Sequence, residues 1–346
     1  MSPRRLLLPL IAVLLVGCTI FGSPSPSVAL RPVTLLLGFQ PDVQFAPFYL
    51  AQQKGYYADI GLDVTIEYKS GADLVRLVAD GQAEFGVADA TDVMISRTAG
   101  IPIKYVETIY GLFPVALIGP KGTVPTDPAE LAGKRIGTPG KFGSSWHALL
   151  ALLHAGGLTE DDVTIREYPQ FNQVDGLLNG DVDLITGFRN NEPLRLAAQG
   201  MEVDLLTVEQ IAPLPGPGVA VGDALLASDK EMVSGFVTAT LQAETEISAD
   251  PQAGIDAAVL AVPAIADDRE TALGVLQATI ELWKAGAAAP SGAINDEVWT
   301  SGYQTMRDLG FIDGSVPLDE MVEHLLKETS ARFAVPVGRA GFLPLG

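Results

Sequence analysis

The sequence predicts an α/β protein of two similar lobes, each a mostly parallel sheet with helices on both faces. Short apolar runs rich in β-branched residues alternate with helix-like segments, which is the pattern of covered parallel sheets. The chain of 346 residues is long enough for about two domains, and its 48% hydrophobic content supports sizeable cores. A spacing of 99 residues recurs between matching segments, which indicates that both domains follow one plan.

The N-terminus has the features of a secretion signal. Arg4 and Arg5 precede an apolar run over 6–16, which as a helix spans roughly 16 Å, about half of a ~30 Å hydrocarbon core. The segment "LVGC" at 15–18 resembles a bacterial lipobox, so we expect a lipoprotein signal peptide over 1–17, Cys18 as lipid anchor and a flexible tether over 18–32. The alternatives are an ordinary signal with an incidental cysteine, or a short membrane anchor. Cys18 is the only cysteine, so an internal disulfide is excluded.

The charge balance is strongly acidic. The formal net charge is -20, and the chain from Cys18 onward lacks two arginines, which lowers it to -22. Such a surface repels nucleic acid and anionic lipid, because nucleic-acid affinity comes largely from Lys and Arg contacts to phosphate. We expect no nucleic-acid partner, and a strongly anionic substrate would need a local basic pocket.

The expected strands fall into two sets, followed by a helical region. The first set comprises 33–39, 63–68, 84–88, 101–110 and 113–119. The second set comprises 134–138, 162–168, 181–188, 203–208 and 218–227. Helix-like segments such as "APFYLAQQKGYYAD" and "SSWHALLALLHAGG" separate them. From 229 to about 327 the pattern becomes mainly helical, and the tail over 331–346 is expected to be irregular.

Matching positions in the two sets support an internal repeat. The matched pairs are Gly38 with Gly137, Val64 with Val163 and Gly81 with Gly180, each 99 apart, and Gly100 with Gly200, 100 apart. Glycines recur at element ends in all α/β proteins, but "DVTIEY" and "DVTIREY" also share their first four letters. The repeat therefore favours two similar lobes over coincidence.

The repeat suggests where the lobes divide and where a ligand binds. We expect lobe 1 over 33–118 and 223–330, and lobe 2 over 119–222. The chain should cross near "LIGPKG" at 117–122 and return near "PLPGPGVAVG" at 213–222, where Gly and Pro suit a hinge. Because ligands of open α/β sheets bind beyond the carboxyl ends of the strands, two facing lobes form a cleft between those ends.

Four segments resemble the NMT1/THI5-like solute-binding proteins of ABC transporters. They are "GFQPDVQFAPFYLAQQKGYYADIGLDVTI", "LVADGQAEFGVADA", "ELAGKRIGTPG" and "NGDVDLITGFRNNEPLRLAAQG", within about 33–225. The resemblance implies a two-lobed type II periplasmic-binding-protein fold joined by a two-strand hinge. It also implies a monomeric receptor in the cell envelope that delivers a small solute to a membrane permease powered by a separate ATPase. Members of the family bind thiamin pyrimidines, flavins, sulfonates, nitrate or other small solutes.

The candidate ligand contacts lie at the expected strand ends. They are Phe39, Gln40, Asp42 and Phe45 in the first turn, Asp89 and Thr91 in the second, Tyr110 before the crossover, Ser144, Ser145 and Trp146 after a Gly-rich turn, and Phe188, Arg189, Asn190 and Glu192 in "GFRNNEP". The Gly-rich turn at 137–143 would aim free backbone N–H groups at the cleft, although it matches neither nucleotide-binding glycine motif.

Each candidate has a purely structural alternative. Asp89 and Thr91 also suit helix capping, and Trp146 also suits a core. Arg189 either pairs with Glu192 or meets a polar ligand. The aromatic residues Tyr110, Phe113, Tyr168 and Phe171 either extend a flat binding slot or simply pack one lobe against the other.

The ligand expected from these residues is a planar heteroaromatic vitamin or precursor, with riboflavin ahead of a thiamin pyrimidine. Many pyrimidine-binding relatives carry an Asn-x-x-His pattern where this chain has Asp42 and Phe45, and aromatic side chains are abundant at the expected cleft. The alternative of another class is a thiamin-pyrimidine biosynthetic enzyme. Family enzymes use a cysteine-rich motif that this chain lacks, so we expect no enzyme. The spacing of His147, His154 and His324 predicts no metal site, and no cofactor is expected.

Overall fold

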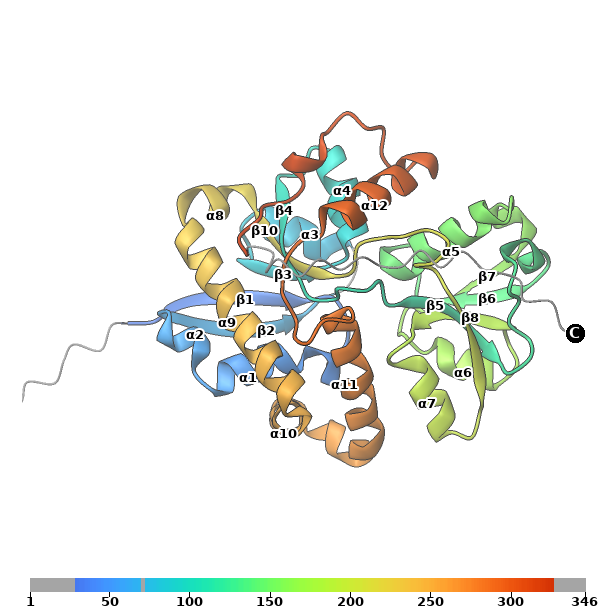
Figure 1. Cartoon of the computed structure of the whole chain (residues 1–346), viewed down its shortest axis with the longest axis horizontal. Helices are drawn as coiled ribbons and strands as arrows, with labels where there is room; N and C mark the ends of the chain where they lie inside the picture. The colour runs from blue at the N-terminus through green and yellow to red at the C-terminus, as the bar shows by residue number, and fades with distance from the viewer. Residues whose placement is uncertain (1–28, 70–71, 327–346) are drawn as a thin grey trace, which may run out of the picture.

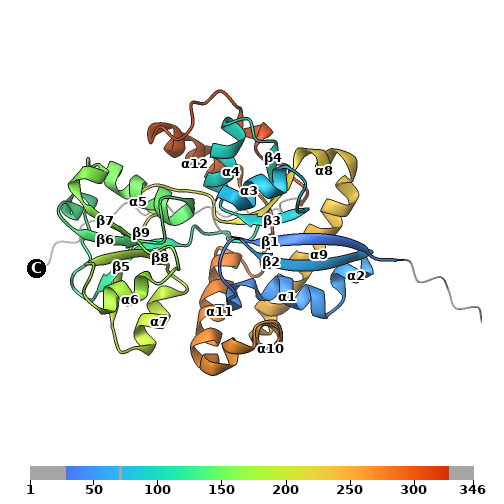
Figure 2. The ribbon, with the colours of Figure 1, turned by 180° about the vertical axis from the view of Figure 1, so that it is seen from behind.

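A computed structural model describes residues 29–69 and 72–326 of the chain. The expected signal peptide, Cys18, most of the expected tether and the tail over 331–346 lie outside these residues. The described chain forms two α/β lobes side by side, joined by two crossing segments (Figures 1 and 2). No helix within the described ranges has the length and apolarity needed to cross a membrane.

The first lobe is built on a five-stranded sheet of mostly parallel strands. In spatial order its strands are β2 (Leu62–Tyr68), β1 (Arg31–Leu37), β3 (Phe85–Ala88), β10 (Gly218–Gly222) and β4 (Ile103–Thr108). Strand β1 pairs in parallel with β2 and β3, whereas β10 runs antiparallel to both of its neighbours. Strand β1 is buried through Val33–Leu37 with one partly exposed position, as expected of a strand covered on both faces.

The second sheet repeats this order. Its strands are β7 (Thr164–Glu167), β6 (Arg135–Thr138), β8 (Leu184–Phe188), β5 (Val115–Pro120) and β9 (Val203–Thr207). Strand β6 pairs in parallel with β7 and β8, and β5 is the antiparallel member. The α/β fold with two mostly parallel, helix-flanked sheets, expected from the sequence, is confirmed.

The 99-residue repeat has a conformational basis. Gly81 and Gly180 have φ of 72° and 73°, and Gly100 and Gly200 have φ of 83° and 82°. This left-handed conformation strains residues with a Cβ, so glycine is required at the same turn of each lobe. The repeat that the sequence shows is thus a repeat of turns between elements.

The crossing points lie several residues before the expected ones. "LIGP" belongs to β5 of the second sheet, and "GVAVG" forms β10 of the first sheet. The crossings are instead 109–114 and 208–217, which lie side by side, since the N–H groups of Ile109 and Tyr110 donate to the carbonyl of Pro217 at 3.2 and 3.0 Å. The boundary expected at 118/119 would cut β5 in two, and the boundary expected at 222/223 would assign β10 to the second lobe, although β10 belongs to the first sheet. Both boundaries are displaced because each crossing strand lies between two other strands of the sheet that it joins.

Helices cover both faces of each sheet. In the first lobe, one face carries α1 (Ala46–Gln53), α9 (Lys230–Ala249), α10 (Pro251–Ala261) and α11 (Arg269–Lys284), with the short α2 (Tyr56–Asp59) and α8 (Asp223–Ser228) packed against α9. The other face carries α3 (Ala72–Ala79), α4 (Ala90–Thr98) and α12 (Asp296–Asp308). In the second lobe, α5 (Gly143–Ala155) covers one face and α6 (Gln173–Leu178) and α7 (Glu192–Ala198) the other. The 3₁₀ turns are η1 (Val43–Phe45), η2 (Pro128–Leu131), η3 (Glu160–Asp162), η4 (Pro263–Asp268) and η5 (Leu318–Glu320).

The helical region after residue 229, also expected, begins each long helix at a polar cap. The side chains of Asp229, Asp250, Asp268 and Asn295 accept hydrogen bonds from backbone N–H groups at the starts of α9, α10, α11 and α12. These bonds satisfy N–H groups that a helix start leaves without partners, and each cap typically contributes about 1 kcal/mol.

One apolar core runs through both lobes. It joins Leu74 and Met94 of the first lobe to Trp146 and Leu149 on α5 of the second. A separate core lies between the first sheet and α1, α9, α10 and α11, and a small one lies inside the second lobe. The lobes therefore meet through buried apolar side chains as well as through the crossings.

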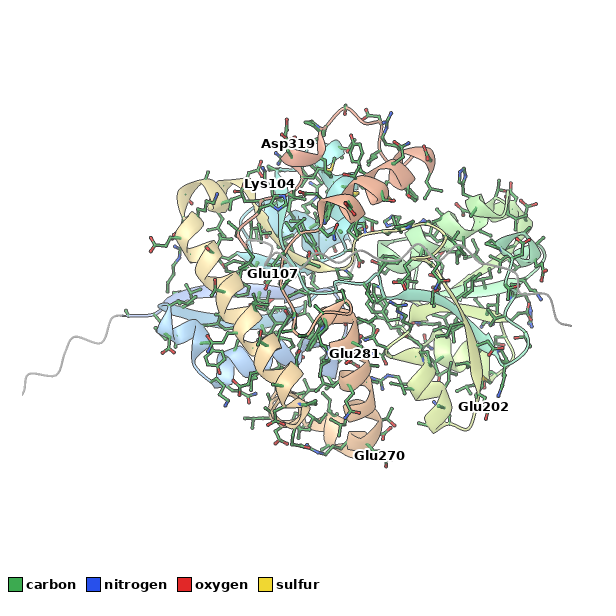
Figure 3. The ribbon with its side chains drawn as sticks, viewed as in Figure 1. Lys104, Glu107, Glu202, Glu270, Glu281 and Asp319 are labelled. Carbon is green, nitrogen blue, oxygen red and sulfur yellow. The ribbon has the colours of Figure 1, made fainter. Side chains whose placement is uncertain are left out.

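Much of the acidic surplus lies on the surface. Figure 3 labels Glu202, Glu270 and Glu281, whose side chains are exposed. Glu107, labelled in the same figure, is the opposite case, because its side chain is fully buried inside the first lobe.

Candidate ligand-binding cleft

A cavity of about 120 Å³ lies between the two lobes. Its walls come from the residues after β1, β3, β6 and β8, together with the first turns of α4 and α5 and both crossing segments. These are the carboxyl ends of parallel strands, where ligands of α/β sheets bind. The cleft between the lobes that the sequence predicts is therefore present.

Aromatic rings form much of the wall. They are Phe39, Phe45, Tyr110, Phe142, Phe171 and Phe188. Two edge-to-face pairs join opposite sides of the cleft: Phe39 with Phe171 at 4.7 Å between ring centroids, and Tyr110 with Phe188 at 5.9 Å. Phe171 has φ of 56°, which is a strained backbone conformation for a bulky residue. Such strain costs on the order of 1–3 kcal/mol, which the surrounding contacts must offset. The wall therefore offers aromatic surface from both lobes to a ligand.

An acidic pair faces the start of α5 across the cleft. Asp89 and Asp92 lie on the first turn of α4, and the carboxylate of Asp89 accepts hydrogen bonds from the backbone N–H of Ser144 at 2.9 Å and from the Ser144 hydroxyl. Burial and the neighbouring Asp89 raise the pKa of Asp92 to about 8. Burial also raises the pKa of Asp89, against the lowering effect of Ser144. Each of these carboxyls therefore holds a proton more tightly than an exposed aspartate does.

A second polar corner lies on the other lobe. Glu192 accepts a hydrogen bond from the backbone N–H of Phe188 at 2.7 Å, and Gln173 donates to it at 3.3 Å. Burial raises the pKa of Glu192 to about 7. The carbonyl oxygen of the Gln173 side chain is buried and has no partner within the described part of the chain. Both residues are among those that line the cavity.

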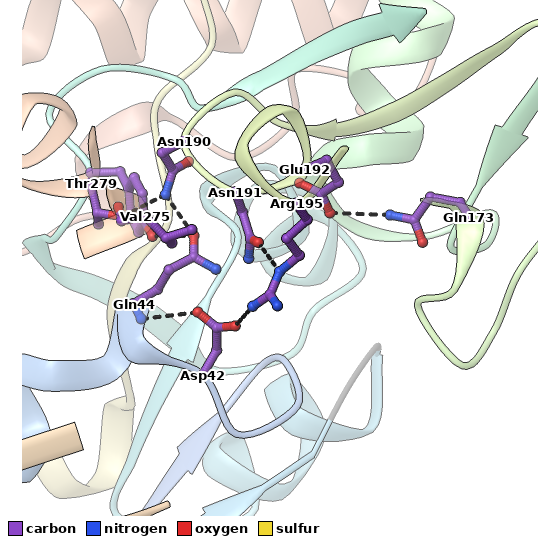
Figure 4. A network of polar contacts seen from close by, with 10 residues as sticks. Asp42, Gln44, Gln173, Asn190, Asn191, Glu192, Arg195, Val275 and Thr279 are labelled. Atoms are coloured by element: carbon purple, nitrogen blue, oxygen red, sulfur yellow. Dashed lines mark hydrogen bonds and ion pairs between the residues drawn. The ribbon is translucent and has the colours of Figure 1, made fainter. Parts of the chain in front are cut away.

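Polar contacts beside the cavity tie the lobes together (Figure 4). Arg195 of α7 donates to Asp42 of the first lobe at 2.6 Å, and Asp42 also accepts from the backbone N–H of Gln44 at 3.1 Å. The amide of Asn190 donates to Gln44 and to Thr279 of α11, both at 2.7 Å. These contacts describe a closed arrangement of the two lobes.

Eight of the expected site residues lie on the cavity wall. They are Phe39, Phe45, Asp89, Tyr110, Ser144, Ser145, Phe188 and Glu192. Asp89 differs from expectation in one respect, because its side chain makes no capping bond to its own helix and reaches across to α5 instead. That these residues contact a ligand stays a prediction.

Three further expected residues form contacts between the lobes and do not line the cavity. Asp42 and Asn190 are buried in the network of Figure 4. Thr91 is buried and its hydroxyl lies 2.8 Å from Nδ1 of His147 on α5. Burial lowers the pKa of His147 to about 4, so this contact joins two neutral groups.

The last three expected residues lie elsewhere. Gln40 is exposed at the turn after β1. Trp146 is only 5% exposed and packs in the core that joins the lobes, which is the structural alternative weighed for it. Arg189 pairs with Glu209 at 2.8 and 2.9 Å, not with Glu192, because the chain turns between 188 and 192 and directs Glu192 back to the Phe188 N–H.

Sequence reasoning left out several wall residues. Gln173 could have been found, because it follows closely on the expected strand over 162–168, as the expected site residues follow theirs. Asp92 lies one turn after Asp89 on the same helix face, a spacing that the sequence also shows. Phe142 gave no signal beyond its place in the Gly-rich turn. The described residues hold no group of three or more potential metal ligands.

The two matching sheets, the two crossings and the cavity between them define a two-lobed protein of the periplasmic-binding-protein fold. The alkanesulfonate-binding protein SsuA from Xanthomonas axonopodis pv. citri, solved bound to MOPS, has this fold, with a TM-score of 0.66 and 18% identity over 86% of this chain and 100% of that one. The chain belongs to the NMT1/THI5-like family, whose model matches residues 42–254. The resemblance stated from the sequence is confirmed.

Two proteins that are similar to this chain in sequence carry names that describe different functions. Riboflavin-binding protein RibY of Chloroflexus aurantiacus is 34% identical over 303 residues, which cover 86% of each chain. The 4-amino-5-hydroxymethyl-2-methylpyrimidine phosphate synthase THI5 of Saccharomyces cerevisiae is 27% identical over 233 residues, 63% of this chain and 68% of that protein.

Proposed function

We propose that this protein is the solute-binding receptor of an ABC importer and that its solute is riboflavin or a related flavin. The observation that carries the proposal is the interlobe cavity with aromatic rings from both lobes on its wall, since aromatic side chains offer apolar and ring–ring contacts to a planar ring system. The similarity to a riboflavin-binding protein supports the same solute.

The cavity also has the polar groups that a flavin needs. A flavin ring carries an imide N–H and carbonyl groups, and its ribityl chain carries hydroxyl donors. Gln173 and Glu192 offer acceptors on one lobe, and Asp89 offers an acceptor on the other. A few well-placed polar groups on largely apolar walls are typical of small-molecule sites.

The proposal includes how the receptor is held at the membrane. The signal peptide over 1–17 and lipidation at Cys18 would hold the receptor, as a monomer, outside the cytoplasmic membrane beside its permease, which a separate ATPase powers. Mass spectrometry of the mature N-terminus tests this part, and a Cys18→Ala variant should be recovered without lipid in the soluble fraction.

The solute is tested on purified protein. The small molecule released on denaturation should be a flavin by mass spectrometry, and added riboflavin should lose fluorescence on binding because its ring stacks against aromatic side chains. Tight binding of a small alkanesulfonate with no binding of any flavin would contradict the proposal. Leu260→Ala serves as the matched control, since Leu260 is 72% exposed and remote from the cavity.

The second candidate is a thiamin-pyrimidine function, which the similarity to pyrimidine phosphate synthases favours. Binding of the free pyrimidine alcohol in place of riboflavin would support a receptor for that solute. Recovery of a chemically altered molecule from the protein would support the enzyme. We favour the receptor because no cysteine follows Cys18 in the sequence.

A further inference from the structure

The charged side chains of the cavity wall are all acidic. Its charged residues are Asp89, Asp92 and Glu192, and no Lys, Arg or His is among the described residues that line it. Two nearby arginines are already paired with acids: Arg195 with Asp42 at 2.6 Å and Arg189 with Glu209 at 2.8 Å. The wall therefore supplies no cation to a ligand that brings a negative charge.

The backbone site that would otherwise attract an anion is occupied by the protein itself. The first N–H groups of the 13-residue helix α5 face the cleft, and such a helix start attracts anions. Asp89 fills this position, accepting from the N–H and hydroxyl of Ser144. A Cβ added at Gly143, where φ is 67°, would come within 2.6 Å of the Asp89 carboxylate, so the two lobes meet closely here.

The magnitudes favour repulsion of an anion at this place. A helix start is equivalent to roughly half a positive charge, and its effect fades within the first turn. Asp89 accepts two hydrogen bonds from Ser144, which favour its charged form, and a pair that holds one proton carries a full negative charge. The acidic pair therefore outweighs the helix start.

An independent feature shows which ligand groups the cavity accepts. The side-chain oxygen of Gln173 is an acceptor without a partner in the described chain, on a residue only 1% exposed that lines the cavity. A buried acceptor without a donor costs about 1–3 kcal/mol, which a ligand N–H or O–H would remove. The wall therefore favours a ligand that has hydrogen-bond donors and no negative charge.

We infer that the cleft selects uncharged, donor-bearing heteroaromatic ligands over their phosphorylated or sulfonated analogues, and that Asp89 and Asp92 are the residues that impose this selection. The inference deepens the proposed function and rests on it for the identity of the ring system. It assigns to the acidic pair a role separate from the aromatic walls.

The test compares two pairs of probes by equilibrium dialysis at pH 7.5. The first pair is riboflavin and its 5′-phosphate, and the second is the hydroxymethyl aminopyrimidine and its phosphate. A phosphate monoester carries about -1.5 to -2 charges at neutral pH. We expect the Kd of the phosphorylated member to be at least about 100-fold weaker, which corresponds to about 2.7 kcal/mol.

The variant Asp89→Asn/Asp92→Asn removes both carboxyl groups, and with them the negative charge of the pair, while keeping oxygen acceptors near Ser144. It should reduce the ratio of the two Kd values by about tenfold or more, mainly through tighter binding of the phosphate. The matched control is Asp161→Asn, which removes one negative charge at an exposed position, as the cleft variant does when the acidic pair holds one proton. If the first variant does not fold, as judged by circular dichroism, Asp89→Ser/Asp92→Ser takes its place.

The outcomes separate the two proposals. Discrimination within the pyrimidine pair, with no flavin bound, would refute the flavin and sustain the charge selection. Equal or tighter binding of a phosphorylated probe by the wild-type protein, or no binding of any of the four probes, would overturn the charge selection. An unchanged ratio in both cleft variants would overturn the role of Asp89 and Asp92.

Discussion

Replacing Glu107 by glutamine is expected to stabilise the folded protein at neutral pH and to change little near pH 4. Glu107 on β4 and Glu244 on α9 are both fully buried, and their four carboxyl oxygens have no hydrogen-bond partner among the described residues. Burial, and for Glu107 also the nearby Glu244, raises the pKa of each carboxyl well above its ordinary value of 4.5. The folded protein therefore holds protons that the unfolded chain releases.

The size of the effect follows from this difference in bound protons. Above pH 4.5, a carboxyl that keeps its proton in the folded state costs about 1.4 kcal/mol of stability for each pH unit. Its contribution is complete below pH 4.5 and declines as the pH rises towards the native pKa. Between pH 5 and pH 7 the penalty grows by at most about 3 kcal/mol, and Glu107→Gln removes one such penalty while its amide gains Glu244 as an acceptor.

The assay is thermal unfolding followed by circular dichroism at pH 5 and pH 7. At roughly 2 °C for each kcal/mol, the melting temperature of Glu107→Gln should exceed that of the wild type by on the order of 6 °C more at pH 7 than at pH 5. Glu246→Gln is the control, because Glu246 lies on α9, the helix that carries Glu244. Hydrogen bonds from Tyr56 and Lys54 lower the pKa of Glu246, so its replacement should remove stability at pH 7.

The result that would refute the reasoning is an equal shift of melting temperature at both pH values. Such a shift would mean that Glu107 acts through packing alone. Destabilisation at pH 7 that exceeds destabilisation at pH 5 would mean that Glu107 is charged and paired in the folded protein.

Three other predictions concern the cleft. Arg195→Met removes the bond to Asp42 and should weaken ligand affinity about fivefold, measured by calorimetry, whereas Arg269→Met at an exposed pair should not; equal effects would refute a role in closure. Phe39→Ala should weaken riboflavin binding by about 10-fold to 100-fold in a fluorescence titration, and unaltered affinity would place the ring elsewhere. Asp92→Asn should reduce the fall in melting temperature from pH 5 to pH 8, because the raised pKa of Asp92 makes its native proton costly over that range; an unaltered slope would mean that Asp92 titrates normally.

Much of the cleft could be placed from the sequence, because strand ends are local features. Phe39 follows β1, Asp89 follows β3, and Phe188 ends β8, and a parallel sheet brings these carboxyl ends to one edge. The direction of each side chain was harder to foresee. Trp146 points into the core and Arg189 meets Glu209, a partner 20 residues away in the chain.

The sequence by itself determined the two matching lobes, since alternating strands and helices and glycine at equivalent left-handed turns are properties of short segments. Only the tertiary structure decided which sheet receives each crossing strand. It also decided that the carboxylate of Asp89 binds the helix of the opposite lobe, and that Glu107 meets Glu244 away from water. These pairings join residues 55 or more positions apart, and the relative placement of packed lobes, not local preference, brings such residues together.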